Sequence, residues 1–174
     1  MAHGDPELIA SLATFPSNAW DGVVYRHMFG DLKADRENVT GARWNPPEVP
    51  AIYVSLERDT ALAEGEYLIR AQPLRPRAPR HLFTIEVKLS SVLDLSTRDA
   101  MEQLELFEKD FALTEYARCQ EVGGTVAWMD HDGLLVPSAR CAGRNLVIFP
   151  NCGKGDDYLF RVTSDEAVTD NESE

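Results

Sequence analysis

The second half of the chain carries several short β-type segments, and little helix-forming sequence separates them. These segments are TVAW, GLLVPS, NLVIF and DYLFRV, within residues 125–162. Parallel strands need long crossovers, usually helices, whereas antiparallel neighbours can be joined by short turns. The spacing therefore predicts a mixed α+β fold and argues against a doubly wound parallel sheet. The length of 174 residues suits a single domain with its own core.

The first part of the chain predicts helices and strands in alternation. Asp5 and Pro6 have the residue types of an N-cap and a first helical position. The elements predicted here are a helix at DPELIASLA, strands at GVVYRHMF and AIYVS, a helix over 60–71 capped by Asp59, strands at HLFTIEVKL and VLDLS, and two helical pieces over 97–122 that end at Gly123-Gly124.

The charge of the chain limits its partners and marks its end. The net charge is −12, and residues 164–174 hold five acids and no base. A polar, acidic segment with few large apolar groups is expected to be disordered, so we predict a folded domain over 1–163 and an acidic disordered tail over 164–174. The remaining body is still acidic and lacks the basic surface that nucleic-acid binding requires.

Several common sites and targeting signals are absent from the sequence. The three cysteines and four histidines follow no metal-binding spacing, so we predict no metal and no disulfide framework. There is no apolar run of about 18 residues and no basic n-region with an apolar h-region, so a reducing cytoplasm is expected. GxGxxG, GxxxxGK[ST] and GxSxG do not occur, so a bound nucleotide would be held by side chains.

One carboxylate of the helix TALAEGEYLIRA falls on its apolar side. At about 100° per residue, Glu64 lies within the arc that contains Tyr67 and Leu68, opposite Glu66 and Arg70. A carboxylate on a buried face is costly unless a partner satisfies it. Glu64 is therefore either a structural core carboxylate or a functional one, and the periodicity leaves both open.

The arginines that do not resemble surface residues are the candidate partners of Glu64. Arg26 lies inside an apolar strand, and Arg43 stands next to Trp44. Arg26 would equally suit the solvent face of its strand, and Trp44 would equally suit the core. Tyr53 alternates with apolar neighbours, so either face of its strand suits it.

The order of the short motifs resembles one known family. YR near the start is followed by GARWN, a proline-containing turn, IYVS, a helix with ALAE, and finally GLLVPSAR and NLVIFPN. In this order and spacing, with eleven residues from Tyr53 to Glu64, residues 20–151 closely resemble the RES domain. That family is named for its arginine, glutamate and serine.

The resemblance implies a fold and an activity. RES domains are similar in fold to ADP-ribosyltransferases, so mixed sheets with flanking helices are expected, with residues 1–163 as the NAD⁺-binding catalytic domain. Members are typically toxins of bacterial toxin–antitoxin pairs that destroy NAD⁺ by hydrolysis or phosphorolysis. NAD⁺ would be the substrate, no cofactor is expected, and the partner would be an antitoxin of the Xre helix-turn-helix type. The sequence leaves the acceptor and a homodimer open.

The family's arginine, glutamate and serine correspond to Arg43 or Arg26, to Glu64 and to Ser138. Cleavage of the nicotinamide–ribose bond passes through an oxocarbenium-like state, as glycoside hydrolysis does. Glu64 would stabilise the positive charge on the ribose and position the acceptor. The two arginines would hold the pyrophosphate through their planar guanidinium groups. Ser138, otherwise a plain turn hydroxyl, would hydrogen-bond the nicotinamide or a phosphate.

Aromatic and amide side chains complete the predicted site. Tyr53, with Trp44 as second choice, would face the cationic nicotinamide ring. Asn45 and Asn145 would support the loops. The predicted catalytic residues are Glu64, Arg43 and Tyr53, and the predicted NAD⁺-binding residues are Arg26, Arg43, Trp44, Asn45, Tyr53 and Ser138.

Two positions depart from the family pattern. Ala42 stands where the family usually has its second glycine, and the PPEVP turn contains no glycine. Ala42 is expected to be strained if the backbone there needs a positive φ. Two other functions would suit the same cleft: a protein ADP-ribosyltransferase, and a catalytically inactive nucleotide-binding module.

Overall fold

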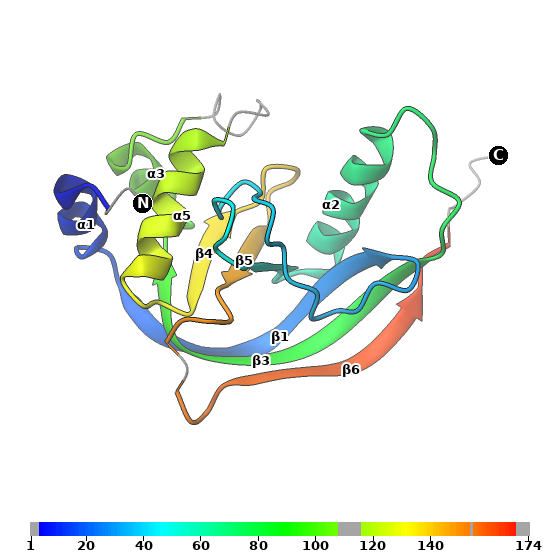
Figure 1. Ribbon diagram of the computed structural model, residues 1–174. Helices are drawn as coiled ribbons and strands as arrows, with labels where there is room; N and C mark the ends of the chain where they lie inside the picture. Colours follow the sequence, from blue (N-terminus) through cyan, green and yellow to red (C-terminus); the bar gives the residue numbers. More distant parts are fainter. Residues whose placement is uncertain (1–3, 108–115, 154, 170–174) are drawn as a thin grey trace.

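The structure is a computed structural model in which residues 4–107, 116–153 and 155–169 are described (Figure 1). The described helices are α1 (Pro6–Leu12), α2 (Arg58–Arg70), α3 (Arg98–Gln103) and α5 (Ala117–Trp128). The described strands are β1 (Ser17–Phe29), β2 (Ile52–Ser55), β3 (Arg80–Asp94), β4 (Gly133–Pro137), β5 (Arg144–Ile148) and β6 (Leu159–Ala167).

The described strands form a six-stranded sheet that closes on itself like a barrel. Their order is β1-β2-β5-β4-β3-β6, and β1 also pairs with β3, so β6 lies outside the closed ring. Only the β3–β4 pair among these is parallel. The short antiparallel strands late in the chain lie next to one another, as their spacing predicted, and the expected α+β class is confirmed.

Two apolar clusters lie on opposite faces of β4 and β5. On β5, Leu146 and Ile148 point into the closed ring, while Val147 joins the cluster beneath α1, α3 and α5. The same alternation on β4 places Leu134 under the helices and Leu135 toward the ring. Strands that are buried on both faces need nearly continuous apolar sequence, which explains the GLLV and NLVIF segments.

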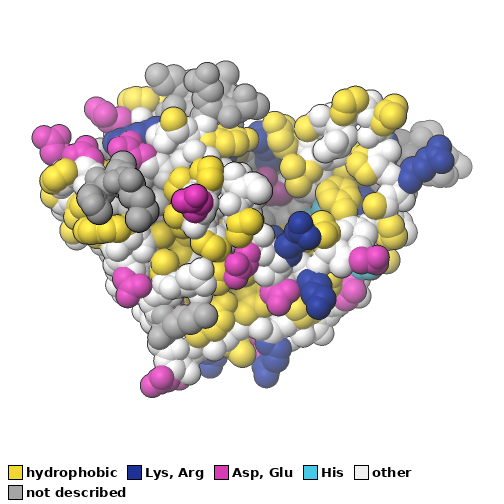
Figure 2. Space-filling model, in the orientation of Figure 1, with side chains coloured by type: hydrophobic (Ala, Val, Ile, Leu, Met, Phe, Trp, Pro, Cys, Tyr) yellow, Lys and Arg dark blue, Asp and Glu magenta, His cyan; other side chains and the backbone are white. Residues whose placement is uncertain are grey.

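The helices stand in two groups above the long curved strands. Figure 1 shows α1, α3 and α5 at one end of β1 and β3, and α2 at the other end, with the 30–50 segment and β4 and β5 between them. Figure 2 shows the surface hollowed between these two groups. The closed ring therefore holds α2 opposite the β4–β5 connection.

α5 corrects two predictions at once. It continues through Gly123 and Gly124, where the sequence predicted a helix end followed by a strand at TVAW. A Cβ added to Gly123 would lie 1.7 Å from the carbonyl oxygen of Trp44, so the glycine permits a close approach between the helix and the 41–47 loop. Part of the helix predicted over 97–122 falls outside the described residues.

The predicted disordered tail is wrong over residues 164–167, which belong to β6. β6 pairs with β3 along its length apart from one register shift, so the ladder satisfies the backbone groups on the inner edge of β6. Asp165 Oδ1 lies 2.7 Å from His81 Nδ1, and Glu166 Oε1 lies 2.6 Å from Arg58 Nη2. The partners of these acids come from distant segments, so local composition does not reveal them. The last five residues of the tail lie outside the described ranges.

Two element boundaries also differ from prediction. β3 is one strand where HLFTIEVKL and VLDLS were predicted as two. At the junction of these two segments, the carboxylate of Asp132 accepts hydrogen bonds from the amides of Ser90 and Ser91 at 2.8 Å each. α2 begins with Glu57 as N-cap rather than Asp59. Glu57 Oε2 accepts a hydrogen bond from the Arg144 amide, which ties the start of α2 to β5.

Candidate active site

A cleft of about 360 Å³ opens between α2, the 38–44 loop and the β4–β5 connection. The residues that line it include most of those predicted from the sequence. Five predicted site residues meet along its wall, namely Arg26, Arg43, Trp44, Tyr53 and Glu64. The amide side chain of Asn145 lines it as well.

Glu64 is held by neutral donors from β5 and from the residue that follows β4. Its Oε1 accepts hydrogen bonds from Ser138 Oγ at 2.7 Å and from Asn145 Nδ2 at 2.9 Å. Ser55 Oγ donates to Asn145 Oδ1 at 2.8 Å and fixes the orientation of that amide. Oε2 of Glu64 accepts no hydrogen bond from the part of the chain that is described. One carboxylate oxygen is therefore fixed and the other remains available to a ligand.

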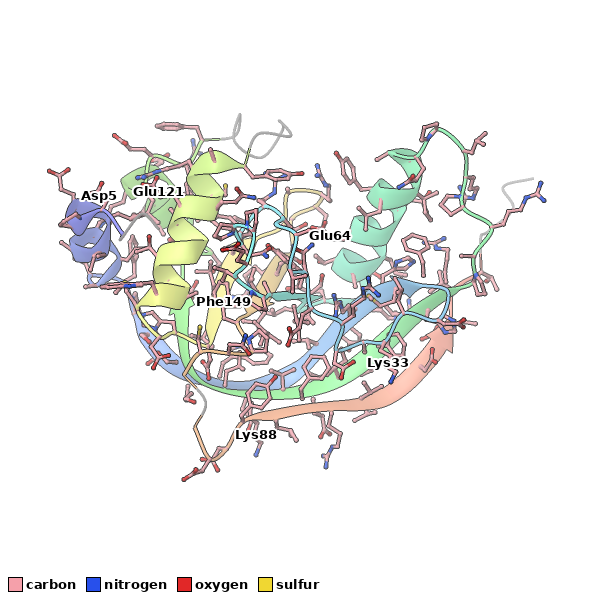
Figure 3. All side chains as sticks on the ribbon, in the orientation of Figure 1. Asp5, Lys33, Glu64, Lys88, Glu121 and Phe149 are labelled. Carbon is pink, nitrogen blue, oxygen red and sulfur yellow. The ribbon has the colours of Figure 1, made fainter. Side chains whose placement is uncertain are left out.

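This arrangement corrects the predicted pairing of Glu64 with an arginine. Figure 3 shows Glu64 on the side of α2 that faces β4 and β5, where the hydroxyl and amide donors lie. Neutral donors satisfy the lone pairs without cancelling the negative charge. The field of the carboxylate is therefore directed at whatever occupies the cleft.

α2 approaches β1 closely just beside Glu64. A Cβ on Gly65 would lie 2.4 Å from Cγ of His27, so only glycine permits this contact. His27 Nε2 accepts a hydrogen bond from Arg80 Nε at 2.9 Å. Burial, with the nearby Arg80, lowers the pKa of His27 to about 4. A neutral imidazole therefore forms the surface on which this turn of α2 rests.

The opposite wall of the cleft is a loop that is organised by the hydroxyl of Tyr53. This hydroxyl donates to Asn45 Oδ1 at 2.7 Å and accepts the Trp44 amide at 2.9 Å. Burial raises the pKa of Tyr53, so the hydroxyl keeps its proton at neutral pH. Asn45 Nδ2 in turn donates to the carbonyl of Val49 at 2.8 Å. The polar end of Tyr53 is thus committed to the loop.

The structure places two predicted residues of this loop differently. Asn45 has no exposed surface and does not line the cleft, so its side chain holds the loop and does not reach the cleft surface. Trp44 lines the cleft but is only 2% exposed, and most of its ring belongs to the core beneath α5. Tyr53 remains the better candidate for an aromatic face in the cleft.

The two predicted arginines reach the cleft from different elements. Arg26 projects from β1, and its Nη1 donates to the carbonyl of Ala34. Burial lowers the pKa of Arg26 to about 10, with Asp35 opposing the shift, so it stays cationic at neutral pH. The guanidinium of Arg43 lies 4.7 Å from the ring centroid of Tyr116. Both cations are held by contacts that leave them at the cleft wall.

The backbone strain expected at Ala42 falls elsewhere. Ala42 has no positive φ, while Gly41 has a φ of 98° and Glu48 one of 75°. The left-handed conformation is therefore carried by a glycine before Ala42 and by a non-glycine residue inside the PPEVP turn. The amide of Ala42 donates to the carbonyl of Asn45 at 3.0 Å, so the loop closes with alanine in place.

Sequence reasoning overlooked Arg140 and Tyr67. The guanidinium carbon of Arg140 lies 3.3 Å from the ring centroid of Tyr67, and both residues line the cleft. The amide of Arg140 donates to Ser138 Oγ at 3.1 Å. Tyr67 follows Glu64 by three positions, which places both on one face of α2. The helical spacing and the SAR tripeptide were the signals that could have identified this pair.

Two further features are absent from the described residues. No group of three or more His, Cys, Asp or Glu residues there is arranged to hold a metal ion. Within the same ranges, no helix is long and apolar enough to cross a membrane.

Comparison with known proteins places this cleft in context. The model of the RES domain matches residues 21–169. The proteins named NAD(+) phosphorylase MbcT from Mycobacterium tuberculosis and Mycobacterium bovis are each 31% identical over 132 residues, which cover 71% of this chain and 71% of each relative. The crystal structure of the M. tuberculosis MbcT–MbcA toxin–antitoxin complex matches with a TM-score of 0.82 and 26% identity, over 95% of this chain and 93% of that one. The chain therefore belongs to the RES domain family.

Proposed function

We propose that this chain cleaves NAD⁺ at the bond between nicotinamide and ribose, with inorganic phosphate as the acceptor. The observation that carries the proposal is the carboxylate of Glu64, fixed through one oxygen and open through the other in a cleft lined by arginines and aromatic rings. The mycobacterial relatives, which are 31% identical to it over 132 residues, are named as NAD⁺ phosphorylases.

The chemistry of the bond explains why such a carboxylate is needed. As the bond breaks, positive charge moves from the pyridinium ring to the ribose carbon and its ring oxygen. A carboxylate that is already oriented stabilises this charge without reorganising during the reaction. Glu64 Oε2 would also accept a hydrogen bond from a ribose hydroxyl. Nicotinamide leaves as a neutral base, so no general acid is required.

The other cleft residues would bind the remainder of the dinucleotide. Arg26 and Arg43 supply positive charge for the pyrophosphate, and Tyr53 supplies an aromatic face for the nicotinamide cation. Ser138 and Asn145 would act by holding Glu64 in place. NAD⁺ would be the substrate and no cofactor would be needed. NAD⁺ cleavage should therefore continue in the presence of a metal chelator.

We also propose that the chain is the toxin of a toxin–antitoxin pair. The support is the structural match to the toxin–antitoxin complex, which spans nearly the whole chain. That the antitoxin is of the Xre type, that the chain forms a homodimer and that it works in the cytoplasm remain predictions from the sequence.

The direct test is to incubate the purified protein with NAD⁺, with and without inorganic phosphate, and to identify the products. We expect nicotinamide and ADP-ribose 1″-phosphate when phosphate is present. Glu64→Gln should lower kcat by about a hundredfold to a thousandfold, with an unchanged melting temperature. Asp59→Asn, an exposed acid on the same helix, is the matched control and should keep full activity.

Different products would redirect the proposal. Free ADP-ribose that forms at the same rate with and without phosphate would identify a hydrolase. ADP-ribose attached to protein would identify a transferase. Full turnover by Glu64→Gln would remove the role assigned to this carboxylate.

A further inference from the structure

Arg140 is a cation in the cleft without an anionic partner among the described residues. Its guanidinium lies against the ring of Tyr67, and its Nε is buried and donates to no acceptor there. A buried donor that lacks an acceptor is costly, so such groups in native proteins call for an explanation. A bound anion at this position would satisfy Nε and balance the charge.

Arg140 lies in a wall between two hollows. Pro137, Ala139 and Arg140 line both the cleft and a second cavity of about 640 Å³. Ser138 lines the second cavity, yet its hydroxyl donates to Glu64 in the cleft. Beside Glu64, the proposed catalytic carboxylate, the short segment 137–140 therefore separates the cleft from the second cavity.

Arg140 is the cation in this wall that is free to bind an ion. The other arginine of the second cavity, Arg98, has its Nε 3.0 Å from Glu102 Oε1 and is largely exposed. Arg26 and Arg43 reach the cleft from β1 and from the 38–44 loop, which are different walls. An anion held by Arg140 would therefore lie beside Glu64 while the first two arginines engage the dinucleotide.

We propose that Arg140, held flat on Tyr67, binds the inorganic phosphate that attacks the ribose, and that this phosphate enters through the second cavity. The inference rests on the proposed phosphorolysis and assigns its acceptor site. Stacking on Tyr67 orients the planar guanidinium, which can then bind two phosphate oxygens side by side. With the dinucleotide in the cleft, a separate entrance lets both substrates be bound together.

The assigned step is balanced without any other reactant. A phosphate oxygen forms a bond to the ribose carbon as the bond to the pyridine nitrogen breaks, and the electron pair of that bond stays on the nitrogen. The products are neutral nicotinamide and ADP-ribose 1″-phosphate. No oxidant, reductant or proton donor takes part.

Steady-state kinetics test the assignment through the two Michaelis constants. Arg140→Met keeps the apolar stem and removes the charge. We expect it to raise KM for phosphate by about tenfold or more, to leave KM for NAD⁺ unchanged, and to increase the share of free ADP-ribose among the products. Arg140→Lys keeps the charge but not the planar fork. Its KM for phosphate should therefore lie between those of the unsubstituted protein and Arg140→Met.

Matched variants separate binding from structure. Arg98→Met removes the paired arginine of the same cavity and should change neither constant. Tyr67→Phe keeps the ring and should raise KM for phosphate less than Tyr67→Leu, which removes the ring. Thermal melting of every variant checks that the fold is kept.

Two results would overturn the assignment. A rise in KM for NAD⁺ alone would show that Arg140 binds the pyrophosphate of the dinucleotide. No change in either constant would show that it only braces the 138–143 turn.

A binding measurement keeps this inference distinct from the proposed function. Inorganic phosphate is titrated into the Glu64→Gln protein, with and without Arg140→Met, and followed by phosphorus NMR. Binding that disappears with Arg140→Met supports the subsite even if the unsubstituted protein fails to cleave NAD⁺. Equal binding in both proteins refutes the subsite whatever the turnover.

Discussion

The two sides of the cleft are built in different ways. The carboxylate side consists of Ser55, Glu64, Ser138 and Asn145, which come from β2, α2, the end of β4, and β5. The loop side consists of Asn38, Trp44, Asn45 and Tyr53, which lie within sixteen positions of one another. Hydrogen bonds join these residues to one another and to the carbonyl of Val49.

This difference predicts that the carboxylate side mainly affects catalysis and that the loop side mainly affects stability. On the carboxylate side, each hydrogen bond either acts on the charged group or orients a residue that does, so a change there should alter the reaction more than the fold. On the loop side, the polar groups satisfy one another beneath the surface, so a change there should alter the fold first. The following variants test that separation, beginning with the largest expected effect.

Gly123→Ala should damage the loop side most. The added Cβ would lie 1.7 Å from the Trp44 carbonyl oxygen, so either α5 or the loop must move. We expect the free energy of unfolding, measured by chemical denaturation, to fall by about 3 kcal/mol. Gly124→Ala is the control, because its Cβ would lie 3.1 Å from Pro46 Cγ and alanine favours a helix. Equal stability of the two variants would contradict the close approach.

Ser138→Ala should reveal the character of the carboxylate side. It removes one hydrogen bond to a charged oxygen and the acceptor of the Arg140 amide, so kcat for NAD⁺ cleavage should fall by roughly tenfold, with a smaller loss in the free energy of unfolding than in the loop-side variant. Tyr53→Phe is the loop-side counterpart, because it removes the hydrogen bonds of the Tyr53 hydroxyl to the Trp44 amide and to Asn45 Oδ1. It should lower the free energy of unfolding by about 1–3 kcal/mol. If Ser138→Ala and Tyr53→Phe showed the same ratio of lost kcat to lost unfolding free energy, the two sides of the cleft would not differ in this way.

Acid sensitivity should trace to His27, behind the carboxylate side. Its pKa falls from 6.5 to about 4 on folding, so the unfolded chain takes up the proton first as the pH drops. This contribution to stability is therefore present above pH 6.5 and is lost progressively toward pH 4. In melting curves across that range, His27→Gln should lose stability less steeply than the unsubstituted protein. Parallel curves would assign the sensitivity to other groups.

Glu48→Gly should give the smallest effect, and the effect should be stabilising. Glu48 has a φ of 75°, which glycine adopts with less strain. We expect the free energy of unfolding to rise by about 0.5–1 kcal/mol, with kcat unchanged. Gly41→Ala is the reverse experiment, since Gly41 has a φ of 98° and its added Cβ would meet Pro47. If Glu48→Gly lost stability instead, the Glu48 side chain would stabilise the fold by more than its positive φ destabilises it.

The α+β class and most strands were predictable because their signals are local. Apolar runs such as NLVIF and the capped start of α1 do not depend on distant residues. The helical position of Glu64 likewise identified it as unusual before any partner was known. Gly123 was misinterpreted because glycine ends helices and also permits close packing, and only the position of Trp44 distinguishes the two. The pairs His81–Asp165 and Arg58–Glu166 join distant segments, so the end of β6 could not be predicted from its acidic composition.

The same limit applied to the candidate site. Spacing within GARWN and IYVS was enough to place Arg43 and Tyr53 together, since a short loop joins them. The donors to Glu64 come from β5 and from the residue after β4, more than seventy positions away, and the predicted arginine partner was wrong for that reason. Arg140 was overlooked because its significance depends on meeting Tyr67 from another element.

The position of β6 outside the closed ring also bears on self-association. An outermost strand presents unsatisfied amides and carbonyls to which a second molecule could add its own strand. Here β6, the outermost strand, carries exposed charged side chains, among them Arg161, Asp165 and Glu166. Pairing two such edges would strip the hydration of these charged groups, which disfavours lateral growth into aggregates.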